Sequence, residues 1–166
     1  MKKAITTVLI FALVLVLCSC ASTTNQVALN NEPSTTVAPE PSDTISLNGY
    51  TVKIVDVHLT KDSNGEAIVA IEYEYTNDND APQSFSMIGQ TKVFQGGVEC
   101  FKDQMYLERD FDWDTNYLEI KGGATISVFV AKPLRNTEDS IEVVFELWDM
   151  MNGKMLGSAS KSFDLQ

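Results

Sequence analysis

Two stretches of the chain alternate apolar and polar side chains with the period of a β-strand. In residues 66–76 the odd-numbered positions are apolar: Ala67, Val69, Ile71, Tyr73 and Tyr75. Residues 140–148 repeat this construction with Ile141, Val143, Phe145 and Leu147. Successive side chains of a strand point to opposite faces, so each run predicts a strand with one buried face. The period favours a domain built on β-sheet rather than on helices.

Turn-forming residues separate the strand-like runs at regular intervals. These turns contain Gly, Asn, Asp or Pro and lie at 63–65, 77–82, 95–97, 121–123 and 151–153. Short strands at this spacing indicate a sandwich or a barrel. We therefore expect one all-β domain over residues 45–166, built as an immunoglobulin-like antiparallel β-sandwich. The almost continuous apolar run from Ile126 to Ala131 predicts one of its more central strands.

The first strand of this domain changes its apolar phase along its length. Val52 and Ile54 share one face, but Val55, Val57 and Leu59 fall on the other. A regular strand would expose one of these sets, whereas a β-bulge near Ile54 and Val55, or a crossing between two sheets, would bury both. First strands of immunoglobulin-like sandwiches often divide in this way, which favours a sandwich over a barrel.

The N-terminus has the features of an export signal. Lys2 and Lys3 precede an uncharged apolar run from Val8 to Leu17. A basic start, a short apolar run and small residues are typical of a secretory signal peptide. The run is too short to cross a bilayer, because a spanning helix needs roughly 20 apolar residues.

The end of this signal, Leu17-Cys18-Ser19-Cys20, resembles the lipobox of bacterial lipoprotein precursors. The resemblance implies cleavage after Ser19 and a diacylglycerol on the sulfur of Cys20, and two acyl chains are what stable anchoring requires. We expect a signal peptide over 1–19 and a protein anchored to the extracytoplasmic face of the membrane through Cys20. Residues 20–44 are rich in Ser, Thr, Asn and Pro without an apolar period, which predicts a disordered tether.

The mature chain would be strongly acidic. The sequence has 12 basic and 23 acidic side chains, a net charge of −11, and loss of Lys2 and Lys3 with the signal leaves −13. Nucleic-acid affinity depends on cationic contacts to phosphate, so we expect no nucleic-acid partner. The acidity is instead typical of a soluble domain that repels its neighbours at a crowded surface.

Few residues of the domain suggest catalysis. With Cys20 lipidated, Cys100 is a lone thiol, and its apolar flanks predict a buried, unreactive side chain. His58 is the single histidine and is expected at a strand end or on the surface. The three methionines of residues 150–155 flank a turn and are expected to pack in the core. No hydrolase, zinc-protease, dithiol or phosphate-loop motif occurs in the sequence, so we do not expect an enzyme.

The most unusual stretch is residues 105–118, in which acidic and aromatic side chains alternate. Asp110, Asp112 and Asp114 could supply oxygen ligands to Ca²⁺ if they converge, because this cation binds several oxygens. The stretch is not an EF-hand loop, since the positions of its glycine and of its final glutamate are Thr115 and Lys121.

The aromatic residues of the same stretch have two interpretations. They could cap an open end of the sandwich in a connection that is only partly ordered. Alternatively, Phe111, Trp113 and Tyr117 could form a binding surface, since aromatic side chains are frequent anchors at interfaces.

Six short motifs are spread over most of residues 45–166. They are Val52-Lys53-Ile54-Val55-Asp56, Leu59-Thr60-Lys61-Asp62, Tyr73-Glu74-Tyr75-Thr76-Asn77, Phe94-Gln95-Gly96-Gly97-Val98-Glu99, Asp114-Thr115-Asn116 and Ile120-Lys121-Gly122-Gly123-Ala124. With the signal, lipobox and tether, they resemble a family of Gram-positive bacterial lipoproteins with a C-terminal domain of unknown function. The resemblance implies an immunoglobulin-like sandwich and export, and it implies no activity.

We expect a membrane-anchored, non-enzymatic module that binds a protein or another envelope component through loops or an edge of the sandwich. The alternative is a domain that senses or binds a cation or a small molecule, with Ca²⁺ at Asp110–Asp114. A hydrolase with an unrecognised site is a more remote alternative. The fold does not choose among them, because sandwiches carry unrelated functions.

Overall fold

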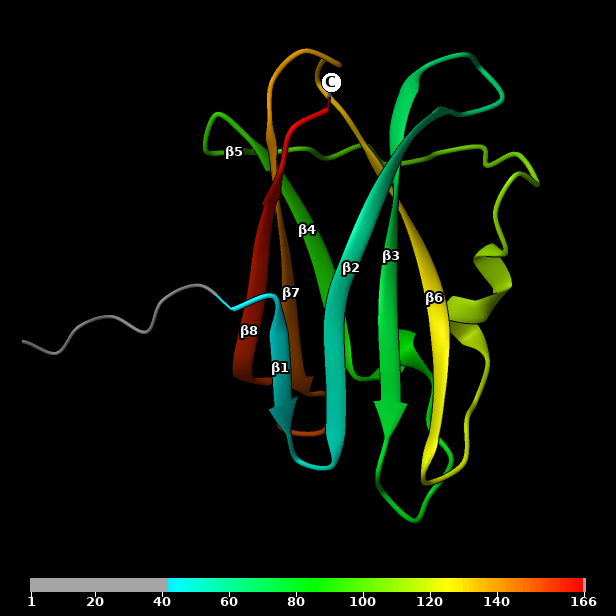
Figure 1. The fold of residues 1–166 in the computed structure, drawn as a ribbon, viewed down its shortest axis with the longest axis vertical. Coiled ribbons are helices and arrows are strands. Elements are labelled where there is room, and N and C mark those ends of the chain that lie inside the picture. Colours follow the sequence, from blue (N-terminus) through cyan, green and yellow to red (C-terminus); the bar gives the residue numbers. More distant parts are fainter. Residues whose placement is uncertain (1–41, 166) are drawn as a thin grey trace, which may run out of the picture. The chain divides into compact units, whose positions relative to one another are not determined.

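Residues 42–165, which the computed structural model describes, form two four-stranded antiparallel sheets that pack face to face (Figure 1). The first sheet has the order β1-β2-β3-β6, with β1 at Thr44–Leu47, β2 at Tyr50–Lys61, β3 at Ala67–Asn77 and β6 at Ala124–Pro133. The second has the order β5-β4-β7-β8, with β5 at Val98–Glu99, β4 at Gly89–Gln95, β7 at Ile141–Asp149 and β8 at Lys154–Phe163. Two short 3₁₀ helices, η1 at Phe85–Met87 and η2 at Trp113–Tyr117, lie in the connections.

The strand order confirms the predicted immunoglobulin-like sandwich. Strands β2, β3 and β6 correspond to A, B and E of an immunoglobulin domain, and β4, β7 and β8 correspond to C, F and G. In that fold, strand D normally pairs with the free edge of strand E. Here residues 100–118, all of them described, contain no strand, and η2 lies against β6 instead (Figure 1). An irregular segment therefore takes the place of strand D.

The core lies between the two sheets and follows the predicted alternation. Most of its largest fully buried side chains come from β3 and β7, among them Ile71, Tyr73, Tyr75, Phe145 and Leu147. Each such side chain contributes about 1.5–3 kcal/mol through removal from water. The Tyr73 hydroxyl lies 2.9 Å from the Thr91 hydroxyl, so this tyrosine is buried without losing its hydrogen bond.

The predicted irregularity of the first strand is a β-bulge. The register of β2 against β3 shifts between Ile54 and Asp56, which leaves Val55 as the extra residue. The Lys161 ammonium of β8 donates to the carbonyl oxygens of Ile54 at 3.4 Å and of Val55 at 2.7 Å. The bulge thus turns two carbonyls toward the second sheet, and a cation on that sheet binds them.

The prediction of a central strand at residues 126–131 is wrong, because β6 is an edge strand that pairs only with β3. Its sequence is apolar on both faces for a different reason. Val128 faces the core and is fully buried, while Phe129 lies on the outer face and stacks on Phe111 at 5.3 Å between ring centroids. Residues outside the sheet therefore cover the face that a central strand would bury against a second layer.

The prediction that the methionines of residues 150–155 pack in the core is also wrong. Met150, Met151 and Met155 are all exposed, as is Met87 in η1. They lie at the end of the sandwich that is lowest in Figure 1, where the β7–β8 turn and η1 meet.

The ordered domain includes the last residues that the sequence assigned to the tether. The Ser42 carbonyl accepts a hydrogen bond from the Ser160 amide, the Asp43 carbonyl accepts one from the Ile54 amide, both at 2.8 Å, and β1 begins at Thr44. The signal peptide, Cys20 and most of the predicted tether lie outside the described residues. Among residues 42–165, no helix has the length and hydropathy that a membrane span requires.

Candidate functional site

The candidate site is the crossover segment, residues 101–118, which leads from the second sheet to the outer face of the first. In Figure 1 the chain leaves β5, crosses the top of the sandwich and descends beside β6. At its start the Cys100 amide donates to the Val93 carbonyl at 2.7 Å, and the Cys100 side chain is buried as predicted. Four groups of contacts then fix the segment to the sheet.

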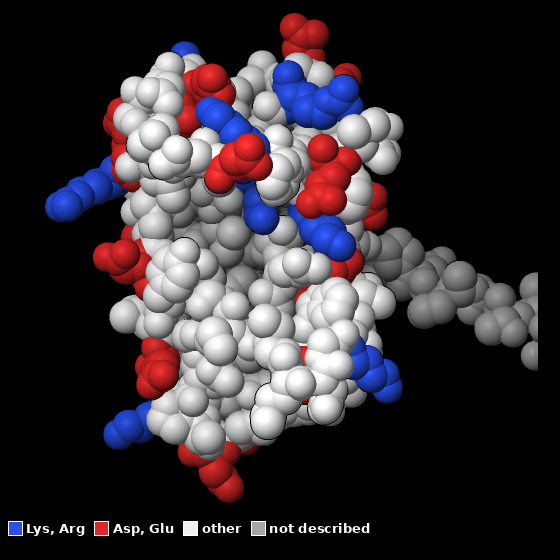
Figure 2. Space-filling model, turned by 180° about the vertical axis from the view of Figure 1, so that it is seen from behind, with Lys and Arg blue, Asp and Glu red and all other residues white. Residues whose placement is uncertain are grey.

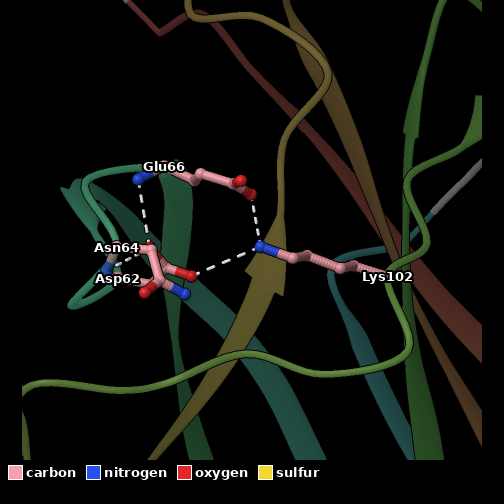
Figure 3. Close-up of polar contacts among 4 residues, drawn as sticks. All are labelled: Asp62, Asn64, Glu66 and Lys102. Carbon is pink, nitrogen blue, oxygen red and sulfur yellow. Dashed lines mark hydrogen bonds and ion pairs between the residues drawn. The ribbon is translucent and has the colours of Figure 1, made fainter.

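The first contact is an ion-pair cluster at the β2–β3 turn (Figure 3). The Lys102 ammonium pairs with Asp62 at 3.4 Å and also with Glu66. The Asp62 carboxylate accepts the amides of Asn64 at 2.9 Å and of Glu66 at 3.0 Å, so it organises the turn as well as binding Lys102. Beside this cluster the Ser63 amide donates to the Tyr106 carbonyl at 2.8 Å.

The electrostatics of the cluster favour its charged form. Asp62 is only 2% exposed, and burial alone would raise its pKa; the amides of Glu66 and Asn64 and the Lys102 ammonium outweigh burial and lower it below the ordinary value. The pKa of Lys102 is raised, chiefly by its hydrogen bond to Glu66, although burial opposes this. The charged form of Asp62 is therefore stabilised mainly by the turn amides, and that of Lys102 mainly by Glu66, with the Asp62–Lys102 pair adding to both.

The second contact is a stack of aromatic rings on the outer face of the first sheet. The Phe111 ring lies 5.5 Å from His58 of β2, 5.3 Å from Phe129 of β6 and 5.2 Å from Trp113. These separations are within the range of favourable aromatic contacts. Phe111 and Trp113 are each partly buried, so the segment covers the apolar outer face of β6 rather than an open end of the sandwich.

The third contact closes a tight loop at residues 108–115. The Trp113 indole N–H donates to the Glu108 carbonyl at 2.6 Å. The Thr115 hydroxyl donates to the Asp112 carbonyl at 2.7 Å and accepts the Phe129 amide at 3.2 Å. A side chain of η2 therefore satisfies a backbone donor on the free edge of β6, a position that a paired strand would otherwise occupy.

The fourth contact uses one of the three predicted Ca²⁺ ligands. The Asp110 carboxylate accepts a hydrogen bond from the Thr60 hydroxyl of β2 at 2.8 Å. Asp112 and Asp114 are exposed, and across residues 42–165 no three His, Cys, Asp or Glu side chains gather as a metal site would require. The structure does not bring Asp110, Asp112 and Asp114 together.

The outward side of the crossover segment carries large apolar side chains. Tyr117 is 69% exposed and Leu118 52%, and Tyr106 is also exposed. A hollow of about 450 Å³ opens on residues 107–114 of the same segment, with a largely polar and aromatic lining: Leu107, Glu108, Arg109, Phe111, Asp112, Trp113 and Asp114. Of the three aromatic residues that the sequence proposed for binding, the structure turns Phe111 and Trp113 inward and Tyr117 outward.

Charged residues are unevenly distributed over the described domain, and exposed carboxylates flank Tyr117 and Leu118, since Asp114 lies in η2 and Glu119 follows Leu118. Figure 2 shows Lys, Arg, Asp and Glu mixed over the upper part of the face seen from behind, whereas its middle carries few charges. The short helices η1 and η2 lie near each other. Three exposed, uncharged side chains come from these helices and the residue after η2: Met87, Tyr117 and Leu118.

The two residues most suited to chemistry are used for packing. Burial raises the pKa of Cys100, which disfavours the reactive thiolate, and its sulfur lies 3.5 Å from the Gln95 amide oxygen. His58 stacks on Phe111, and its Nε2 lies 3.7 Å from a carboxylate oxygen of Glu72. Within the described part of the chain, every buried side-chain nitrogen and oxygen has a hydrogen-bond partner.

A family model for a domain of unknown function, DUF5067, matches residues 25–146, which is more than half of the chain. The chain belongs to the DUF5067 family. The whole crossover segment lies inside the DUF5067 match, whereas β8 lies beyond its end. Membership confirms the coarser part of the resemblance, a domain of unknown function.

The remaining comparisons are with curated sequences and with solved structures. No curated protein sequence matches the chain. An NMR structure of a protein from Enterococcus faecalis is similar, with 19% identity and a TM-score of 0.49 over 75% of this chain and 90% of that one.

Sequence reasoning missed the residues that fix the crossover segment. Asp62 stands just before the Asn64-Gly65 turn, a position where carboxylates commonly accept turn amides, so its local role was detectable. The partnership of Asp62 with Lys102 and of Thr60 with Asp110 joins residues 40 and 50 positions apart, and no local signal predicts it.

Proposed function

We propose that this DUF5067 protein is a non-enzymatic binding module that contacts a protein partner through the outward side of the crossover segment. The observation that carries the proposal is the exposure of Tyr106, Tyr117 and Leu118 on a segment whose backbone is fixed at both ends. Exposed aromatic side chains in a mobile loop would lose much conformational entropy on binding. A segment that is already ordered loses less.

The different orientations of the three aromatic residues support the same function. Phe111 attaches the segment to the sheet and Trp113 closes the loop within the segment, which leaves Tyr117 free to act as an anchor. Interface hot spots are enriched in tyrosine, and interface cores are enriched in aromatic residues and methionine. Tyr117 and the exposed Met87 of the neighbouring η1 supply both kinds of side chain.

The proposed location is the extracytoplasmic face of the cell membrane of a Gram-positive bacterium, with the lipid on Cys20 as the anchor. The lipobox-like Leu17-Cys18-Ser19-Cys20 and the signal-like residues before it support this placement. A lipid anchor and a long polar tether would present the domain to partners in the envelope without a membrane-spanning helix.

The test compares the lipidated protein with a variant carrying Tyr117→Ser and Leu118→Ser. Both are immobilised at equal amounts and used to bind proteins from detergent-solubilised membranes, which mass spectrometry then identifies. Val98→Ser is the matched control, since Val98 is 51% exposed but lies on β5. A partner retained by wild type and by the control, and lost by the double variant with an unchanged melting temperature, is the expected result. Identical protein profiles for all three would contradict the proposal.

A further inference from the structure

The methionine hollow lies at the end of the sandwich opposite the Lys102 cluster. It has a volume of about 310 Å³, and three exposed methionines line it: Met87, Met150 and Met151. Met87 comes from η1, whereas Met150 and Met151 come from the β7–β8 turn. Methionine is usually buried in soluble domains, so three exposed methionines around one hollow require an explanation other than core packing.

The backbone around the methionine hollow is held in place. The Trp148 amide donates to the Ile88 carbonyl at 2.9 Å, which joins the end of η1 to the end of β7. The Asp149 carboxylate accepts the amides of Met151 and Asn152, both at 3.1 Å. These bonds keep the three methionine backbones together, while the long side chains can adjust their sulfur positions through several rotatable bonds.

The donor set of the hollow is chemically selective. Thioethers are soft ligands that prefer Cu(I), and hard cations prefer oxygen. Asp149 is the one carboxylate that lines the hollow, and its oxygens already accept the turn amides and the Asn152 side chain at 2.6 Å. His58 stacks on Phe111 at the crossover segment, and Cys100 is buried among the residues of β4. The hollow therefore offers three thioethers beside the neutral oxygen-bearing side chains of Asn48, Tyr50 and Gln83, and its lining contains no histidine or cysteine.

We infer that the methionine hollow binds one soft monovalent cation, Cu(I), through the thioethers of Met87, Met150 and Met151. This site shares Met87 with the exposed surface of η1 and η2, but it does not depend on the binding of a protein partner there. Cysteine and histidine sites lose affinity as they are protonated, but a thioether has no proton to gain in this range. Binding at the hollow is therefore independent of pH between about 5 and 8.

The test is an anaerobic titration of the full chain in detergent with Cu(I), in competition with the chromophoric chelator bicinchoninate. Cys18, Cys20 and Cys100 are replaced by Ser so that no thiol contributes. One Cu(I) per chain is expected for this protein. Met150→Leu with Met151→Leu, and separately Met87→Leu, keep the apolar shape but remove sulfur; each is expected to lower the affinity at least about tenfold. Met155→Leu is the control, because Met155 is exposed outside the hollow.

Three results would overturn the inference. The first is no withdrawal of Cu(I) from the chelator by the thiol-free protein. The second is full affinity in the leucine variants, which would place the ion elsewhere or show that the hollow serves only apolar contacts. The third is an affinity that rises tenfold per pH unit, which would require a protonatable ligand. Circular dichroism of every variant checks that the fold is unchanged.

Discussion

A single buried carboxylate connects two parts of the chain that are far apart in sequence. Asp62 accepts two amides of the β2–β3 turn and binds Lys102 at the start of the crossover segment (Figure 3). The same carboxylate therefore holds both the turn and the start of the segment in place. Buried charges are tolerated when they are paired and hydrogen-bonded, as Asp62 is.

The lowered pKa of Asp62 predicts how stability depends on pH. The ordinary carboxyl pKa here is 3.8, and the folded value lies below it. The stabilisation is therefore fully present above about pH 4 and is lost as pH falls through the folded pKa. We expect Asp62→Asn to lower the melting temperature at pH 7 and to flatten its decrease between pH 5 and pH 2. A wild-type-like acid profile in Asp62→Asn would show that other carboxylates dominate.

Burial of Cys100 predicts an inert thiol. In the full chain with Cys18→Ser and Cys20→Ser, the raised pKa and low exposure of Cys100 should block reaction with a disulfide reagent such as DTNB at pH 7. The same protein should react with one equivalent in denaturant. Rapid labelling of the folded protein, at the rate of a free thiol, would contradict this account.

At the scale of elements, the apolar period predicted the strands well and their neighbours less well. Residues 66–76 and 140–148 correspond to β3 and β7, and the phase change at Ile54 and Val55 is the bulge of β2. These features depend on local alternation. The place of β6 depends instead on what covers its outer face, and that cover comes from Phe111 and Thr115 of the crossover segment.

The same limit explains which part of the candidate site was predictable. The alternation in residues 105–118 identified an unusual stretch and named Tyr117. It did not show that Phe111 would pack inward, because a period-two pattern in a segment without a strand does not assign its faces. The exposure of Met150 and Met151 likewise depends on their position in the turn between β7 and β8, and their hydropathy alone does not predict it.

Phe111 and Tyr117 should respond differently to truncation. Phe111→Ala removes the contacts with His58 and Phe129, so we expect a decrease of about 1–2 kcal/mol in the free energy of unfolding, less than for a core phenylalanine. Tyr117→Ala removes an exposed ring and should change it by less than about 0.5 kcal/mol. Urea titrations measure both. Equal effects would mean that the two rings share one environment.

At the scale of the whole molecule, the domain is a sandwich whose edge strand is protected by an irregular segment. The net charge of −11 keeps such a domain soluble, while the crossover segment presents exposed aromatic side chains, Tyr106 and Tyr117, among its charged residues. With the proposed anchor on Cys20, partner contact would take place close to the membrane. A short distance between anchor and partner raises the effective concentration of the domain.

The proposed anchor gives a direct prediction about location. Cys20→Ser removes the acceptor sulfur, so the variant should leave the membrane fraction and, if still processed, appear in the culture medium. Incorporation of radiolabelled palmitate into wild type but not into the variant is the accompanying measurement. Membrane retention of the variant at the wild-type level would contradict a lipid anchor at this residue.

Contact between the outward side of the crossover segment and a partner can be measured inside the cell. A photoreactive amino acid is placed at Tyr117, or at the exposed Ser158 of β8 as a control, and intact cells that make the protein at its natural level are irradiated. One reproducible crosslinked species is expected from position 117 and none from position 158. A folded, anchored protein that yields no adduct at 117, or the same adducts at both positions, would contradict the proposed contact.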